Sequence, residues 1–117
     1  MTLSRDAFLG GKLQIWQPRC GYRAGVDPVL LAAACPAKPG QSVLELGCGV
    51  GTALLCLAVR VPGLDLAGID VQSDIAKLAR RNGTENGVDL EKQDGALAAN
   101  PAAMRARSID QDVATPA

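Results

Sequence analysis

Apolar and polar residues in the middle of the chain form short apolar runs that alternate with longer stretches of helical spacing. Residues 42–46 and 64–69 are short and mostly apolar, which is the pattern of strands buried on both faces of a sheet. Longer segments that are typical of helices follow them at residues 52–60 and 73–82. The order strand, helix, strand, helix predicts a parallel α/β sheet with right-handed crossovers.

Turn-forming residues mark where the second of these helices ends and what comes after it. Gly83 is expected to end that helix in a left-handed conformation. Asn86 and Gly87 then turn the chain into a third, weaker strand at residues 88–93. A short helix is expected after it, at residues 100–107.

The start of the chain follows a different pattern. Residues 12–17 alternate between polar and apolar side chains and predict a short strand or a hairpin. Asp27 and Pro28 then predict the start of a helix, with Asp27 capping its free amide groups and Pro28 at its first position. We therefore divide the chain into residues 1–40, which precede the sheet, and residues 41–117, which form it.

The segment between the first sheet strand and its helix carries the strongest chemical signal. An acidic residue is followed by three alternating glycines, in the order Glu45, Leu46, Gly47, Cys48, Gly49, Val50, Gly51. Such glycines let a chain turn tightly and bring backbone N–H groups close to a ligand, although a plain strand-to-helix turn can contain them too. A dinucleotide fingerprint would need its third glycine at position 52, where the chain has Thr52. An NAD-dependent oxidoreductase is therefore disfavoured.

The order E-x-G-x-G-x-G resembles the first motif of class I S-adenosylmethionine-dependent methyltransferases. A wider match over residues 6 to about 95 includes Gln17-Pro18, Gly21 to Ala34 and Leu78 to Asn82. There the chain resembles the amino-terminal portion of the small-domain methyltransferases related to the bacterial tRNA(Val) adenine-N6 enzyme. The resemblance implies a Rossmann-like methyltransferase fold, a parallel sheet with helices on both faces. This chain has room for about three to four of its roughly seven strands.

The resemblance also implies S-adenosylmethionine as the cofactor. Asp70, at the end of the second strand, would accept hydrogen bonds from the ribose hydroxyls. Glu45 would hold the cofactor's ammonium group or would instead satisfy N–H groups of the loop. Asp94 would accept a hydrogen bond from the adenine amine. The candidate cofactor-binding residues are Glu45, Gly47, Cys48, Gly49, Gly51, Asp70, Asp94, Gln17, Arg23 and Asp27.

The loop before the first helix closes over the cofactor in such enzymes. Residues 1–40 would accordingly be a cofactor-covering segment, and residues 41–117 a partial S-adenosylmethionine-binding domain. Gln17, Arg23 and Asp27 become candidates for contacts with the cofactor or the substrate. Asp27 fits a helix cap equally well, and Arg23 fits a solvated surface charge equally well.

A motif for the methyl acceptor is absent from the sequence. Enzymes that methylate an exocyclic base nitrogen carry Asn/Asp-Pro-Pro-Tyr/Phe after the fourth strand, and residues 1–117 contain no such motif. No catalytic residue is assigned. The leading interpretation is an S-adenosylmethionine-dependent N-methyltransferase of the tRNA adenine-N6 type, truncated before this motif and inactive alone. The alternative is a non-catalytic remnant that binds S-adenosylmethionine or a partner protein.

Composition and charge limit the partners further. Twelve basic and twelve acidic residues cancel, so any contact with tRNA must be local. His is absent and the four cysteines lack C-x-x-C spacing, so we expect no metal site. The sequence has neither an apolar run of about 18 residues nor a charged and apolar leader, so we expect a cytoplasmic protein without a membrane span.

Overall fold

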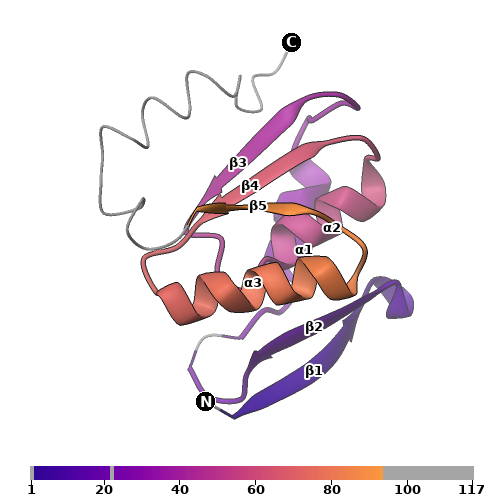
Figure 1. Ribbon diagram of the computed structural model, residues 1–117. Coiled ribbons are helices and arrows are strands. Elements are labelled where there is room, and N and C mark those ends of the chain that lie inside the picture. The colour runs from indigo at the N-terminus through magenta and orange to yellow at the C-terminus, as the bar shows by residue number, and fades with distance from the viewer. Residues whose placement is uncertain (1, 22, 94–117) are drawn as a thin grey trace.

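The computed structural model describes residues 2–21 and 23–93 (Figure 1). Within these described residues, five strands form two sheets. An antiparallel hairpin consists of β1 (Leu3–Phe8) and β2 (Leu13–Pro18). A parallel sheet has the order β3 (Ser42–Leu46), β4 (Asp65–Ile69), β5 (Leu90–Gln93). The expected helix at residues 100–107 lies outside the described residues.

Two helices connect the parallel strands, namely α2 (Thr52–Arg60) and α3 (Ser73–Glu85). The chain steps twice in the same direction across the sheet, so right-handed crossovers place both helices on one face. The start of α2 lies against α3, because a Cβ added at Gly51, just before α2, would be 3.4 Å from the Ala79 Cβ. The predicted parallel α/β class is confirmed.

The core lies between this sheet and its helices. Thr52–Leu57 of α2 are buried without interruption, because the helix is enclosed by the sheet, the hairpin and a further helix, α1 (Asp27–Ala34). Arg60, at the end of α2, donates hydrogen bonds to the carbonyl oxygens of Ala32 and Cys35 at the end of α1. The carboxyl-terminal end of α1 is thereby fixed to the end of α2.

The predicted cap of α1 is wrong. Val26 already has helical backbone angles (φ −82°, ψ −24°), and its carbonyl oxygen accepts a hydrogen bond of 2.9 Å from the Leu30 amide. Asp27 is consequently the first helical residue, and none of the described side chains caps this end. Pro28 still lies in the first turn, where its missing N–H leaves no bond unmade.

The predicted stop at Gly83 is also wrong. Helix α3 continues through Gly83 to Glu85, and the chain turns at Asn86 and Gly87, where Gly87 has φ +72°. A Cβ at Gly83 would lie 2.7 Å from the Val88 carbonyl oxygen. Glycine is therefore needed here for the close approach of the returning chain.

The hairpin lies beside α3, on the side away from the parallel sheet (Figure 1). The strand predicted at residues 12–17 is confirmed as β2, and β1 is an additional strand paired with it from Leu3↔Pro18 to Phe8↔Leu13. Leu13 and Ile15 of β2 point into the core and are almost fully buried. Within residues 2–21 and 23–93, no helix is long and apolar enough to cross a bilayer.

Candidate functional site

A cavity of about 520 Å³ opens at the carboxyl ends of β3 and β4. Its size lies within the range of about 300–1,000 Å³ that is usual for small-molecule sites. Three segments form its walls: the loop from Glu45 to Ala53, the segment from Asp70 to Ile75, and the loop between β2 and α1. The crevice beyond the strand ends is where open parallel sheets bind ligands.

The glycine loop is clamped to the end of β4. Gly47 and Cys48 donate backbone hydrogen bonds of 2.7 and 3.0 Å to the Ile69 carbonyl oxygen. Gly47, Gly49 and Gly51 have φ of +70°, +58° and +92°, a conformation that L side chains rarely adopt. The loop therefore has the compact shape that the alternating glycines predicted.

Asp70 fixes the next part of the loop. Its Oδ2 accepts a hydrogen bond of 3.0 Å from the Gly49 amide, and its Oδ1 accepts one of 2.9 Å from the Gln72 amide. A carboxylate has about four lone-pair positions, so each oxygen can accept another hydrogen bond from the cavity. Asp70 is thus an oriented acceptor in the cavity wall.

Glu45 lines the same cavity but, unlike Asp70, it has a carboxyl oxygen without a hydrogen bond from the described residues. Its Oε1 is buried without a hydrogen-bond partner among the described residues, and burial raises its pKa to about 7. The amides of Gly47 and Cys48 bond to Ile69, so they are not satisfied by Glu45. A buried, unpaired carboxyl group of this kind suits a cationic ligand group, because such a group would compensate the lost solvation.

Cys48 and Thr52 complete this wall. Burial, followed by the nearby charges of Glu45 and Asp70, raises the pKa of the Cys48 thiol to about 12, so the thiol stays protonated and is no nucleophile. Thr52 Oγ1 is buried and has no partner in the described part of the chain. We did not select Thr52 from the sequence, although its position directly after the third glycine was a signal.

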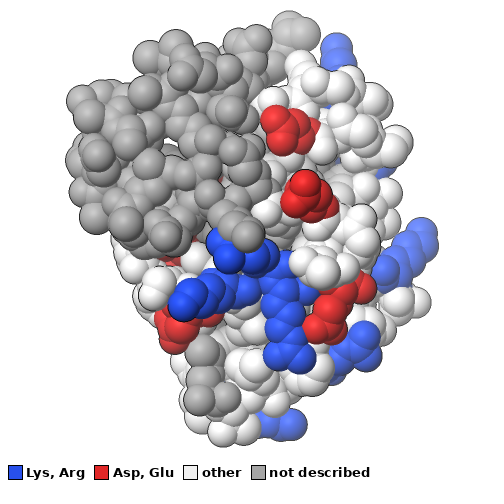
Figure 2. Space-filling view, viewed as in Figure 1, with Lys and Arg blue, Asp and Glu red and all other residues white. Residues whose placement is uncertain are grey.

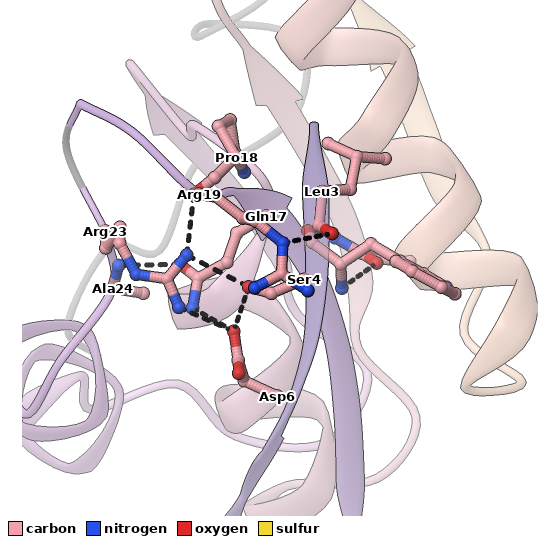
Figure 3. A network of polar contacts seen from close by, with 10 residues as sticks. Leu3, Ser4, Asp6, Gln17, Pro18, Arg19, Arg23 and Ala24 are labelled. Atoms are coloured by element: carbon pink, nitrogen blue, oxygen red, sulfur yellow. Dashed lines mark hydrogen bonds and ion pairs between the residues drawn. The ribbon is translucent and has the colours of Figure 1, made fainter. Parts of the chain in front are cut away.

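The opposite wall comes from the end of the hairpin and depends on a polar network (Figure 3). Gln17 is 2% exposed; its Nε2 donates to Asp6 Oδ2 at 2.8 Å, and its Oε1 accepts from the Ala24 amide at 2.8 Å. Arg23 forms an ion pair of 2.9 Å with Asp6 and donates to Ser4 Oγ. Hydrogen bonds, that from Gln17 first, hold the pKa of Asp6 below its ordinary value.

The structure brings most of the candidate residues together. Six of them line the cavity: Gln17, Glu45, Gly47, Cys48, Gly49 and Asp70. Gly51, Arg23 and Asp27 are not among its lining residues, because Gly51 packs against α3, Arg23 pairs with Asp6 and Asp27 begins α1. Asp94 lies outside the described residues. Residues 2–21 and 23–93 contain no group of three His, Cys, Asp or Glu suited to a metal ion.

Known proteins share both the sequence pattern and the fold. The profile of a methyltransferase domain family matches residues 43–111. A tRNA1(Val) (adenine(37)-N6)-methyltransferase of Photorhabdus laumondii is 29% identical over 97 residues, covering 79% of this chain and 40% of the relative. The enzyme of the same name from Parabacteroides distasonis is 35% identical over 80 residues, covering 68% of this chain and 33% of the relative. The chain thus spans well under half of these relatives.

A solved structure extends the comparison. The tRNA (uracil-54, C5)-methyltransferase of Pyrococcus abyssi in complex with S-adenosyl-L-homocysteine has a TM-score of 0.60 and 25% identity to this chain. The similarity covers 79% of this chain and 23% of that one.

Proposed function

Because the chain belongs to the methyltransferase domain family, we propose that it binds S-adenosylmethionine in the cavity at the ends of β3 and β4 and serves methyl transfer. The observation that carries this proposal is the buried Glu45 Oε1 beside the glycine loop, which has no hydrogen-bond partner within residues 2–21 and 23–93. S-adenosylmethionine has an ammonium group that would pair with this carboxylate and a ribose diol that would donate to Asp70. Its sulfonium ion supplies an already activated methyl group.

In this proposal, different residues of the cavity bind different parts of the cofactor. The glycine loop would face the amino-acid part of the cofactor, where Glu45 would pair with the ammonium group. The Thr52 hydroxyl, which has no partner among the described residues, would donate to the cofactor's carboxylate. Asp70 would orient the ribose. Residues 1–40, through Gln17 and the loop after β2, would cover the bound cofactor.

Separate calorimetric titrations with each ligand test the cofactor. We expect S-adenosylmethionine and S-adenosylhomocysteine to bind in isothermal titration calorimetry, and NAD to bind far more weakly, because Thr52 stands where a dinucleotide loop needs glycine. Thr52→Gly is the variant for comparison, since it creates the glycine spacing of a dinucleotide-binding loop. Tighter binding of NAD than of S-adenosylhomocysteine by the unmodified chain would contradict the proposal.

We further propose tRNA as the methyl acceptor, at an adenine N6. The names of the two curated relatives support this choice. So does charge placement, because Figure 2 shows Lys and Arg side chains gathered over α3, whose sequence includes Lys77, Arg80 and Arg81. Arg81 forms an ion pair of 2.8 Å with Glu85, so local phosphate contacts on this surface would come first from Lys77, which is exposed.

Transfer of a radiolabelled methyl group to bulk tRNA tests the acceptor. Residues 1–117 lack the Asn-Pro-Pro-Tyr motif, so we expect no measurable transfer by these residues alone. A chimera in which the carboxyl-terminal part of the Parabacteroides distasonis relative follows residue 93 should produce N6-methyladenine. Equal transfer by residues 1–117 would overturn the view that the acceptor site needs that motif.

A further inference from the structure

Asn82 of α3 connects the two walls of the cavity through its hydrogen bonds to β2 and to the glycine loop. It is a polar residue of α3 with 0% exposure, and its side chain contacts both β2 and the glycine loop. We propose that Asn82 is a positioning residue of the cofactor site, which holds the glycine loop at Val50 in a fixed relation to the hairpin. The inference rests on the proposed function only for its consequence on cofactor affinity.

The side-chain amide of Asn82 uses both its acceptor oxygen and its two donor protons. Oδ1 accepts the backbone N–H of Trp16 at 2.8 Å, and Nδ2 donates to the Trp16 carbonyl oxygen at 2.9 Å. The second proton of Nδ2 goes to the Val50 carbonyl oxygen, also at 2.9 Å. One buried side chain thus satisfies three backbone groups, and leaving any of them unpaired would cost free energy.

Both contacts lead directly to the cavity. Val50 lies between Gly49 and Gly51 in the loop and itself lines the cavity. Trp16 is followed by Gln17, which forms the opposite wall. The other hydrogen bonds that hold the loop run to Ile69, at the end of β4, and to Asp70, directly after it, so Asn82 holds the loop from the side of α3. Its amide therefore sets the separation of the two walls.

Asn86, the residue that directly follows α3, provides a matched control. Its Oδ1 accepts a hydrogen bond from the Gln14 amide at 3.0 Å, and its Nδ2 donates one to the Gln14 carbonyl oxygen at 2.9 Å. The two asparagines thus bond to the backbone of β2 along the edge that does not pair with β1, as a neighbouring strand would. The contacts of Asn86 are to Gln14 and to the Asn82 carbonyl oxygen, whereas Asn82 reaches the loop.

Hydrogen exchange of the ligand-free protein separates loop positioning from hairpin docking. In Asn82→Ala we expect the Gly49 and Gly51 amides to exchange at least about tenfold faster than in the unmodified protein, and in Asn86→Ala to change by less than about twofold. Both variants should alter the fluorescence of Trp16, the single tryptophan of the sequence. If Asn82→Ala does not unfold cooperatively, Asn82→Ser replaces it, because the hydroxyl buries no charge and has both a donor and an acceptor. Equal acceleration in both variants, or none in the Asn82 variant, overturns the inference.

Calorimetric titration with S-adenosylhomocysteine then measures the consequence. We expect affinity to fall about tenfold or more in the Asn82 variant and to change by less than about twofold in Asn86→Ala. An unmodified protein that binds neither S-adenosylhomocysteine nor S-adenosylmethionine would refute the proposed function, while the exchange rates still decide whether Asn82 positions the loop. Binding that falls equally in both variants would overturn the role of Asn82 in the site.

Discussion

The Gly49 amide donates a hydrogen bond of 3.0 Å to Asp70 Oδ2, so the loop after β3 and the acid after β4 form one structural unit. The second oxygen of Asp70 is fixed by the Gln72 amide. A carboxylate held at both oxygens is oriented before a ligand arrives, and the entropy lost on binding is correspondingly smaller. The same bonds tie the shape of the glycine loop to Asp70.

Replacing Asp70 tests this double role. We expect Asp70→Ala to weaken the binding of S-adenosylhomocysteine by about 1.5–3 kcal/mol, the range for hydrogen bonds to a charged group. Asp65→Ala is the control, because Asp65 is an exposed acid at the opposite end of β4. Calorimetry gives the affinities and circular dichroism checks the fold. An unchanged dissociation constant in a folded Asp70→Ala protein would remove Asp70 from the site.

Local sequence patterns were sufficient to predict the parallel sheet and its glycine loop. The strand at Ser42–Leu46 and the helix at Thr52–Arg60 have the predicted bounds, because apolar runs and flanking glycines define them within a few residues. Glu45 and Asp70 were placed at one edge by the rule that parallel strands end together, and both line the cavity. Neither inference needed a long-range contact.

Contacts between distant residues account for what the sequence did not show. The Arg23 guanidinium is bound by Asp6, which lies 17 residues earlier in the sequence. Strand β1 is stabilised by its pairing with β2. The stop assigned to Gly83 was wrong because the returning chain at Val88 requires a glycine inside the helix. None of these relationships leaves a periodic signal in the local sequence.

The raised pKa of Glu45 predicts an unusual dependence of stability on pH. Its ordinary value is 4.5 and its value in the folded protein is about 7, so the folded state binds more protons between these limits. The free energy of unfolding should therefore fall as pH rises from about 4.5 to about 7, by at most about 1.4 kcal/mol per pH unit, and then level off. Urea unfolding across this range measures it. Glu45→Gln should remove the fall, and a fall of equal size in that variant would assign it to other groups.

Cofactor binding should release protons from Glu45. A cationic ammonium beside the carboxyl group favours its charged form and lowers its pKa from about 7. At pH 6 we expect binding of S-adenosylmethionine to release a fraction of a proton, measured by calorimetry in buffers of different ionisation enthalpy. Glu45→Gln should release less. Methylthioadenosine, which lacks the amino-acid part, should bind without this release, and equal release by both ligands would place the ammonium elsewhere.

Gly83→Ala tests close packing against helix propensity, because the two effects have opposite signs. Alanine in a helix interior is favoured over glycine by about 1 kcal/mol. A Cβ at Gly83, however, would lie 2.7 Å from the Val88 carbonyl oxygen and 3.0 Å from Leu90 Cγ, and overpacking of this kind costs about 1–3 kcal/mol. We expect packing to dominate, since a backbone oxygen can move away only if β5 shifts. The variant should therefore lower the free energy of unfolding in urea.

Gly25→Ala is the control for this measurement. A Cβ at Gly25 would meet nothing within 4 Å, so this variant should leave stability unchanged or raise it slightly by restricting the unfolded chain. Because β5 follows the turn after α3, the Gly83 variant should also speed amide exchange in Leu90–Gln93, whereas Gly25→Ala should not. A Gly83→Ala protein that is more stable than the unmodified chain would mean that helix propensity prevails and that the approach of Val88 relaxes at little cost.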